Sequence, residues 1–278
     1  MGLFDDVRRR CAAIAGAAQH VRIDLSAPVE PGGTVGFDPH LVDLDAPLEE
    51  RARFVLILDA INFGSGWFDE LGTGTDEMTR RLSARGSPWT AAELRELGPG
   101  EVAAVLGQGP DHALMALYAR ALNELGEWLG ERPALEAVAT TGAEALAVQL
   151  AALRSFDDPG FYKRAQIAAN DLVLAGVATY ADVDRLTIFA DNLVPHVLRV
   201  DGVLRYDDTL AARVDAGEEL ARGSREEVEI RACAVHACEA IAARLGVPPR
   251  ILDNWLWNRG QGPPYSDALP HRTCTTAY

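Results

Sequence analysis

The stretch "LTIFADNLVPHVLRV", residues 186–200, places one carboxylate, Asp191, among residues that are almost all apolar. A buried ionised carboxylate destabilises a fold unless a cation or hydrogen-bond donors compensate it. The chain must therefore either satisfy Asp191 structurally or use its charge. In one interpretation Asp191 is a cap or turn residue before Pro195, and in the other it projects into a pocket beside Phe189 as an aromatic platform. The pattern alone favours the cap.

A basic pair, Lys163 and Arg164, stands near the predicted start of an amphipathic helix in "FYKRAQIAANDL", residues 161–172. Neighbouring helical residues point about 100° apart, so at most one of the two is expected to face a pocket. The amides and the partial positive charge of a helix N-terminus suit a phosphate. The alternative interpretation is a solvated basic pair.

The stretch "RILDNWLWNRG", residues 250–260, gathers polar and aromatic side chains in one predicted helix. Asp253, Asn254 and Asn258 offer donors and acceptors that could read the edge of a heterocycle. Trp257 and the tryptophan two residues before it cannot share one helix face, so one is expected in the core and the other along a cavity. In the structural alternative, Asp253 bonds only to a nearby arginine or a helix end.

Two further candidates lie in segments predicted to be irregular. Trp67 follows the Gly-rich run "NFGSG", residues 62–66, which would suit a tight turn or a ligand equally well. His40 follows Pro39 in a loop, where the alternative is an exposed histidine without a role. The sequence lacks the P-loop, dinucleotide-binding, serine-hydrolase and zinc-protease signatures, so those four chemistries lose their usual support.

Composition indicates an ordinary globular protein, with 278 residues of which 48% are hydrophobic. The 26 Lys and Arg against 41 Asp and Glu give a net charge of −15, which opposes a nucleic-acid polymer or an anionic membrane as partner. Four cysteines without C-x-x-C spacing indicate reduced thiols rather than disulfides or a zinc site. No apolar stretch approaches the ~20 residues of a spanning helix. We predict a soluble, cytoplasmic protein without metal or cofactor, and no particular oligomeric state.

Helical apolar spacing bounded by Gly or Pro predicts a mainly α fold. Residues 20–40, with three prolines and three glycines, predict a long loop or a small β ribbon. Thr90 with Glu93 and Ser224 with Glu227 fit the capping box. We predict one domain over residues 1–278, because only short linkers separate the helices. The predicted helices are 3–18, 47–62, 75–85, 90–97, 99–107, 111–129, 132–152, 160–175, 180–194, 207–222, 224–246 and 248–258.

Six blocks occur in order along the chain: "ILDAINFGSGWF", "FYKRAQIAANDL", "LTIFADNLVP", "EEVEIRACAVHACEAI", "ILDNWLWNRG" and "LPHRTCTTAY". From about residue 20 to the C-terminus they resemble the queuosine salvage family, the queuosine 5′-phosphate N-glycosylases. The resemblance implies a single helical domain similar to helix-hairpin-helix DNA glycosylases. It also implies hydrolysis of queuosine 5′-phosphate, which releases queuine, a 7-deazaguanine base, for salvage into tRNA modification. On this basis the functional interpretation of Asp191 replaces the cap.

The resemblance assigns roles to individual residues. The Phe-Ala-Asp block of the family matches Phe189 and Asp191, and its Lys-Arg helix start matches Lys163. The Asp-aromatic-aromatic-Leu-Trp block matches Asp253 to Trp257, and His40 fits a substrate-contact histidine. Two positions depart from the family pattern, which commonly has an aromatic residue at Asn254 and an acid at Asn258.

The implied reaction develops positive charge on the ribose as its C–N bond breaks, and a fixed carboxylate stabilises that charge. The resemblance gives this role to Asp191, which would also orient or deprotonate the attacking water. Asp253 is expected to hold the edge of the base, while Phe189 and one tryptophan sandwich its face. Lys163 is the first candidate for the 5′-phosphate, and His271 with Arg272 is the second.

Two other functions compete with this one. A non-catalytic binding protein for a modified nucleotide or base would use Asp191 only to pair with an exocyclic amine. A DNA-repair glycosylase would share the implied fold, but the acidic charge balance opposes it.

Overall fold

The computed structural model describes residues 2–38 and 42–278. Within these ranges the chain forms fourteen α-helices, four short 3-10 helices and one two-stranded sheet, which confirms the mainly α fold. No helix in these ranges is both long and apolar enough to cross a membrane. The chain divides into two compact units, each built from several segments. The single domain over residues 1–278 and the likeness to DNA glycosylases stay predictions.

The first unit comprises Met1–Val35, Pro159–Lys163 and Asp184–Thr275. Its elements are α1 (Leu3–Gly16), β1 (Val21–Ile23), α11 (Leu193–Val200), β2 (Leu204–Tyr206), α12 (Asp208–Asp215), α13 (Arg225–Leu245), α14 (Pro249–Gly260) and η4 (Tyr265–Asp267). The short η3 (Val183–Arg185) lies where the chain passes from the second unit into the first.

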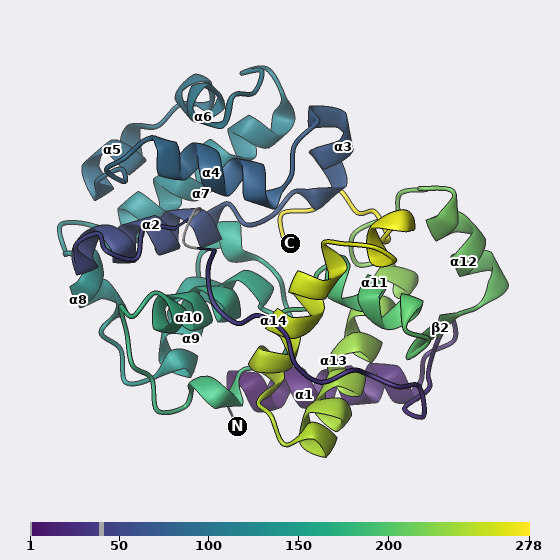
Figure 1. Cartoon of the computed structure of the whole chain (residues 1–278). Coiled ribbons are helices and arrows are strands. Elements are labelled where there is room, and N and C mark those ends of the chain that lie inside the picture. Colours follow the sequence, from purple (N-terminus) through teal and green to yellow (C-terminus); the bar gives the residue numbers. More distant parts are fainter. Residues whose placement is uncertain (1, 39–41) are drawn as a thin grey trace. The chain divides into compact units, whose positions relative to one another are not determined.

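Helix α13 is the centre of this unit. Twelve of its 21 residues are buried, and they lie all around the helix, as expected of an interior helix. Its many Ala and Cys residues are small, so α1, α11, α14 and β1 can all pack against it. Figure 1 shows α1, in purple, alongside α13. Helix α1 contributes one apolar face, because Phe4, Val7 and Cys11 recur at helical spacing and are buried.

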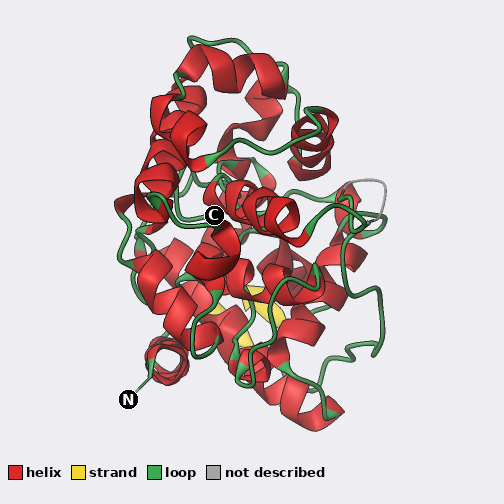
Figure 2. Ribbon diagram, turned by 90° about the vertical axis from the view of Figure 1, so that its left-hand side faces the viewer, coloured by secondary structure: helices red, strands yellow, loops and turns green. Residues whose placement is uncertain are grey.

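The sheet is a single antiparallel pair in the first unit. Strand β1 pairs with β2 so that Val21 lies opposite Tyr206 and Ile23 opposite Leu204. Figure 2 shows how short the two yellow strands are beside the red helices. The β segment expected near residues 20–40 is confirmed at β1, and its partner comes from far along the sequence.

The second unit comprises Gly36–Asp158, Arg164–Val183 and Thr276–Tyr278. Its long helix α7 packs against α2, α5 and α6, and α2 also packs against α8. The elements are α2 (Leu48–Ala60), η1 (Ser65–Trp67), α3 (Phe68–Leu71), α4 (Thr75–Ala84), α5 (Ala91–Glu96), α6 (Pro99–Leu106), α7 (Ala113–Leu129), α8 (Ala134–Val138), α9 (Ala143–Ala151), η2 (Arg154–Phe156) and α10 (Lys163–Leu174), whose first residue belongs to the first unit.

Three predicted helices differ from the structure. The helix predicted over 132–152 is two helices, α8 and α9, because the chain leaves the helix at Ala139 and re-enters it after Gly142. The helix predicted over 180–194 is wrong, since residues 186–192 are not helical and α11 begins only at Leu193. The helix predicted over 207–222 ends at Asp215.

The two predicted capping boxes have different outcomes. At α5 the box is complete, because the Thr90 hydroxyl accepts from the Glu93 N–H and the Glu93 carboxylate accepts from the Thr90 N–H. At α13 the Ser224 hydroxyl caps the helix as predicted, but the Glu227 carboxylate accepts from the Gly223 N–H instead. The other oxygen of the Glu227 carboxylate pairs with Arg231 of α13 at 3.3 Å.

Gly260, at the end of α14, lies where α14 packs closely against α11. A Cβ at this position would come within 2.9 Å of side-chain atoms of Leu193 and Val197. We expect Gly260→Ala to lower the free energy of unfolding by about 1–3 kcal/mol, because a packed interface must open to admit it. Urea unfolding measures this loss, and Gly262→Ala, where a Cβ meets open space, is the control. Equal effects of the two substitutions would contradict the close packing.

Candidate active site

The segment that carries Asp191 is buried and irregular. Residues 186–190 have no helical or strand assignment, and all five are buried in the first unit. Buried backbone N–H and C=O groups need hydrogen-bond partners, and this segment has none from a ladder or a helix turn. Side chains from three helices supply several of them instead.

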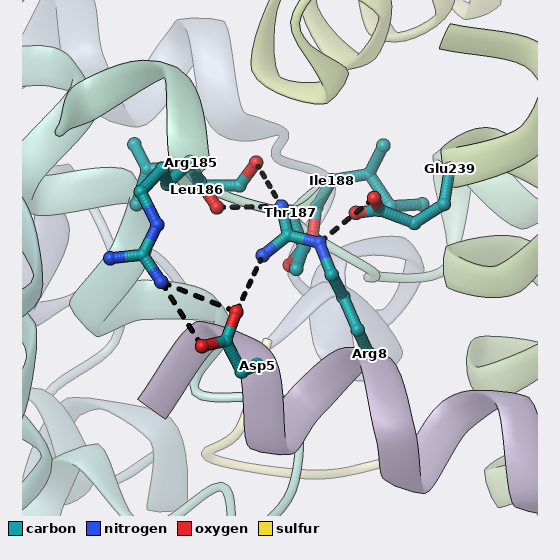
Figure 3. Close-up of polar contacts among 7 residues, drawn as sticks. All are labelled: Asp5, Arg8, Arg185, Leu186, Thr187, Ile188 and Glu239. Carbon is teal, nitrogen blue, oxygen red and sulfur yellow. Dashed lines mark hydrogen bonds and ion pairs between the residues drawn. The ribbon is translucent and has the colours of Figure 1, made fainter. Parts of the chain in front are cut away.

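Arg8 of α1 binds the start of this segment (Figure 3). Its guanidinium donates to the carbonyl oxygens of Arg185 at 2.6 Å and Leu186 at 3.4 Å. The same guanidinium is fixed by the Glu239 carboxylate at 2.9 Å, and Asp5 lies at 4.0 Å. The N-terminal helix therefore fixes the chain just before the segment turns toward Asp191.

Two buried side chains bind the residues next to Asp191. Asp253 of α14 accepts a hydrogen bond from the Phe189 N–H through Oδ1 at 2.8 Å. Arg231 of α13 donates from Nε to the carbonyl oxygen of Ala190 at 2.9 Å. The backbone on the N-terminal side of Asp191 is thus fixed at two consecutive residues.

Asp191 itself is 8% exposed. Its Oδ1 accepts from the N–H groups of Leu193 at 2.8 Å and Val194 at 3.0 Å, the first two residues of α11. Among the described residues no hydrogen bond reaches its Oδ2. The cap expected from the pattern is therefore confirmed, and it uses only one carboxylate oxygen. The helix N-terminus stabilises the negative charge.

Lys163 and Arg164 are both buried, so the solvated basic pair is wrong. Arg164 donates to the carbonyl oxygens of Ala60, at 2.7 Å, and Ser155, and its role in the second unit is structural. Lys163 is 4% exposed and follows Tyr162, a bulky residue with a φ of +53°. Such backbone is strained for a residue with a side chain and is often found at functional sites.

Lys163 is also the only lysine in a chain with 25 arginines. Every other strongly basic side chain in this protein is an arginine. The buried Lys163 therefore indicates a position that needs the compact ammonium group of lysine rather than the planar guanidinium of arginine. The sequence carried this signal, which a search for motifs does not detect.

The side-chain amides of α14 bond mainly to backbone carbonyl groups of the same helix. Asn254 donates through Nδ2 to the carbonyl oxygen of Arg250 at 3.0 Å. Asn258 donates to that of Asn254 at 2.8 Å and to that of Thr34 at 3.2 Å. Both amides therefore have structural partners. Trp257 and Trp255 are both half-buried against the core of the first unit.

His271 is buried in the first unit. Burial, the nearby charge of Arg231 and His196 lower the pKa of His271 to about 3. Burial also lowers the pKa of His196, whose Nε2 lies 2.9 Å from the carbonyl oxygen of Tyr265. At neutral pH His271 is therefore a neutral imidazole. It could bind a phosphate as a hydrogen-bond donor but not as a cation.

The remaining two candidates lie elsewhere. Trp67 is half-buried at the end of η1 in the second unit. His40 lies outside the described residues. Within the described part of the chain, no cluster of three or more His, Cys, Asp or Glu side chains could hold a metal ion.

A cavity of about 360 Å³ in the second unit contains none of the predicted site residues. Two of its arginines have partners at the C-terminal end of α7, whereas the buried Nε of the third, Arg53, has no hydrogen-bond partner among the described residues. Arg95 donates to the carbonyl oxygen of Gly130 at 3.1 Å, and Arg132 donates to that of Trp128 at 2.6 Å. Arg95 and Arg132 thus cap the C-terminus of α7.

The sequence was compared with known protein families and proteins. The family model described as "Queuosine salvage protein" matches residues 75–278. The chain belongs to the queuosine salvage protein family. It is 34% identical over 266 residues to the queuosine 5′-phosphate N-glycosylase/hydrolase of Sphaerobacter thermophilus, covering 83% of this chain and 82% of the relative. Proteins of the same name from Dictyostelium discoideum and Mus musculus are 36% identical over 136 residues and 40% identical over 89 residues. These two alignments cover 42% and 31% of this chain, and 40% and 26% of the relatives.

The queuosine salvage match includes most of the predicted site. Asp191, Lys163 and Asp253 lie inside the matched residues, whereas His40 and Trp67 precede them.

Sequence reasoning missed the buried Arg231, which binds Ala190 next to Asp191. The available signal was a charged pair, Glu227 and Arg231, four residues apart just before the Ala- and Cys-rich run of α13.

Proposed function

We propose that this chain hydrolyses the N-glycosidic bond of queuosine 5′-phosphate and releases queuine for salvage. Its membership of the queuosine salvage family and the name shared by its relatives support this activity. The structural observation behind the proposal is that the two carboxylate oxygens of Asp191 have different surroundings. One oxygen is fixed by the N-terminus of α11, and no described residue donates a hydrogen bond to the other.

The reaction requires such a carboxylate. As the C–N bond lengthens, the ribose acquires oxocarbenium character, and a negative oxygen held in place lowers the energy of that state. Two helix N–H groups orient Asp191 before substrate arrives, so little reorganisation accompanies bond cleavage. In our proposal Oδ2 faces the anomeric carbon and orients the attacking water.

The base would lie near the segment that Asp253 binds. A 7-deazapurine lacks the N7 atom that a purine hydrolase would protonate, so help for the leaving group must come through other ring positions. One oxygen of Asp253 accepts from the Phe189 N–H, so we propose that Asp253 fixes Phe189 for stacking on the face of the base. Phe189 and either Trp255 or Trp257 remain the candidates for stacking.

We propose Lys163 as the ligand of the 5′-phosphate. We expect Lys163→Met to raise the KM for queuosine 5′-phosphate by about 10- to 100-fold, the value of a charge-assisted hydrogen bond. Hydrolysis of the nucleoside, which lacks the phosphate, should change little. Steady-state kinetics on both substrates measure this. Lys163→Arg keeps the charge on a bulkier head and should recover only part of the loss. An equal loss on both substrates would contradict the phosphate role.

The decisive test of the activity is direct. Purified protein is incubated with queuosine 5′-phosphate, and free queuine is separated by chromatography. Release of base by the wild-type protein, and none by Asp191→Asn, supports the hydrolase. Stoichiometric binding without release would instead support the non-catalytic binding protein.

We also propose a cytoplasmic location, with a small nucleotide as the only nucleic-acid-like partner. No disulfide joins any of the four cysteines, all of which lie in the described chain, as expected of a reducing compartment. The net charge of −15 disfavours both a polynucleotide and an anionic membrane.

A further inference from the structure

Arg231 contacts both segments that carry the proposed catalytic groups. Its guanidinium carbon lies 3.9 Å from the centre of the Phe161 ring, two residues before Lys163. Its Nε donates to the carbonyl oxygen of Ala190, the residue before Asp191. One rigid side chain in the first unit therefore bridges the phosphate-binding segment and the carboxylate segment.

The side chain that makes this bridge is held firmly. Arg231 is 3% exposed, and its Nη1 pairs at 3.3 Å with the Glu227 carboxylate one turn earlier on α13. The Gly223 N–H donates to the same carboxylate at 3.0 Å. A buried ion pair adds little net stability compared with apolar residues of the same volume. The Arg231–Glu227 pair therefore serves to hold the Arg231 side chain in place rather than to stabilise the fold.

We propose that Arg231 is a positioning residue that fixes the spacing between Lys163 and Asp191. The inference rests on the proposed function. The binding energy of the phosphate accelerates cleavage only if the anomeric carbon then lies against Asp191. Without the bridge, phosphate and carboxylate would each keep their chemistry, but a bound substrate would be misaligned. Turnover would fall while binding persists.

The test separates position from charge and from folding. Arg231→Lys keeps a cation opposite Glu227 but loses the planar group that both stacks on Phe161 and donates to Ala190. Arg231→Met with Glu227→Gln removes the ion pair as a unit, so that no uncompensated charge stays buried. In both variants we expect kcat for queuosine 5′-phosphate to fall about 10²-fold, with KM within about threefold of wild type.

Glu229→Ala is the matched control on the same helix. Glu229 is buried, and it accepts from the backbone N–H groups of Gln19 and His20, away from residues 186–191. Its loss should lower the melting temperature as much as the Arg231 variants do, yet leave kcat within about threefold of wild type. A kcat of Arg231→Lys equal to that of wild type, or an equal fall in Glu229→Ala, would overturn the positioning role. Absence of base release by the wild-type protein would instead overturn the proposed function itself, and the inference with it.

Discussion

Asp191→Asn is expected to lower the turnover of queuosine 5′-phosphate by about 10³-fold while the nucleotide still binds. The structure makes this substitution unusually clean. An asparagine side-chain oxygen can still accept the N–H groups of Leu193 and Val194, so the cap of α11 is kept. Only the second oxygen changes, from a charged acceptor to a neutral amide. Single-turnover assays by chromatography measure the rate, and calorimetry measures nucleotide affinity.

Asp207→Asn is the matched control for this substitution. Asp207 also caps a helix of the first unit, since its Oδ1 accepts from the Leu210 N–H at 2.8 Å. If the effect of Asp191→Asn comes from the cap, both variants should lose activity and stability together. We expect only Asp191→Asn to lose activity. Unchanged turnover in Asp191→Asn would remove this carboxylate from the mechanism.

Acid destabilisation of the fold is the second large expected effect, and it comes from His271. Because the folded-state pKa is about 3 and the unfolded value is near 6.5, the unfolded chain binds the extra proton between these limits. The stabilisation from the neutral imidazole is present above pH 6.5 and is lost as the pH falls toward 3. The folding equilibrium constant should drop about tenfold for each pH unit and each proton taken up. His196, whose pKa is also lowered, adds to the loss.

Urea unfolding between pH 5 and 6.5 measures this slope. In that window histidines dominate, because the pKa values of carboxylates such as Asp207, lowered by the Leu210 N–H and by His20, lie below it. His271→Asn should flatten the slope by up to one proton. His236→Asn, at an exposed position of α13, is the control for the substitution itself. Equal slopes for wild type and His271→Asn would show that this imidazole is accessible to protons in the folded state.

Helices whose ends carry local signals were predictable from the sequence. Ser224 and Gly246 delimit α13, and both ends follow from a side-chain cap and a left-handed residue. The segment before α11 was not predictable in this way. Its apolar residues fit a helix, but side chains distant in the sequence, such as Arg8, bind its backbone instead, and no local pattern reports such contacts.

The candidate site shows the same division. Asp191 stood out because a lone carboxylate in an apolar run must have a partner or a use, and the structure gives it a helix end while no described residue bonds to its second oxygen. The separate fates of Lys163 and Arg164 could not be inferred, because adjacent residues on one helix differ only in tertiary surroundings. Arg231 was missed for the same reason, since its role depends on Phe161 and Ala190, which are remote in sequence.

The contact of Arg8 with the carbonyl oxygens of Arg185 and Leu186 limits how far this enzyme can be shortened. The match to the family model begins at residue 75, well after α1 has ended. A minimal fragment designed from that match would keep Asp191, but two carbonyl groups upstream of it would lose their donor and α13 would lose its contact with α1. Expression boundaries for this protein should therefore start ahead of Leu3, even though the family-model match starts at residue 75.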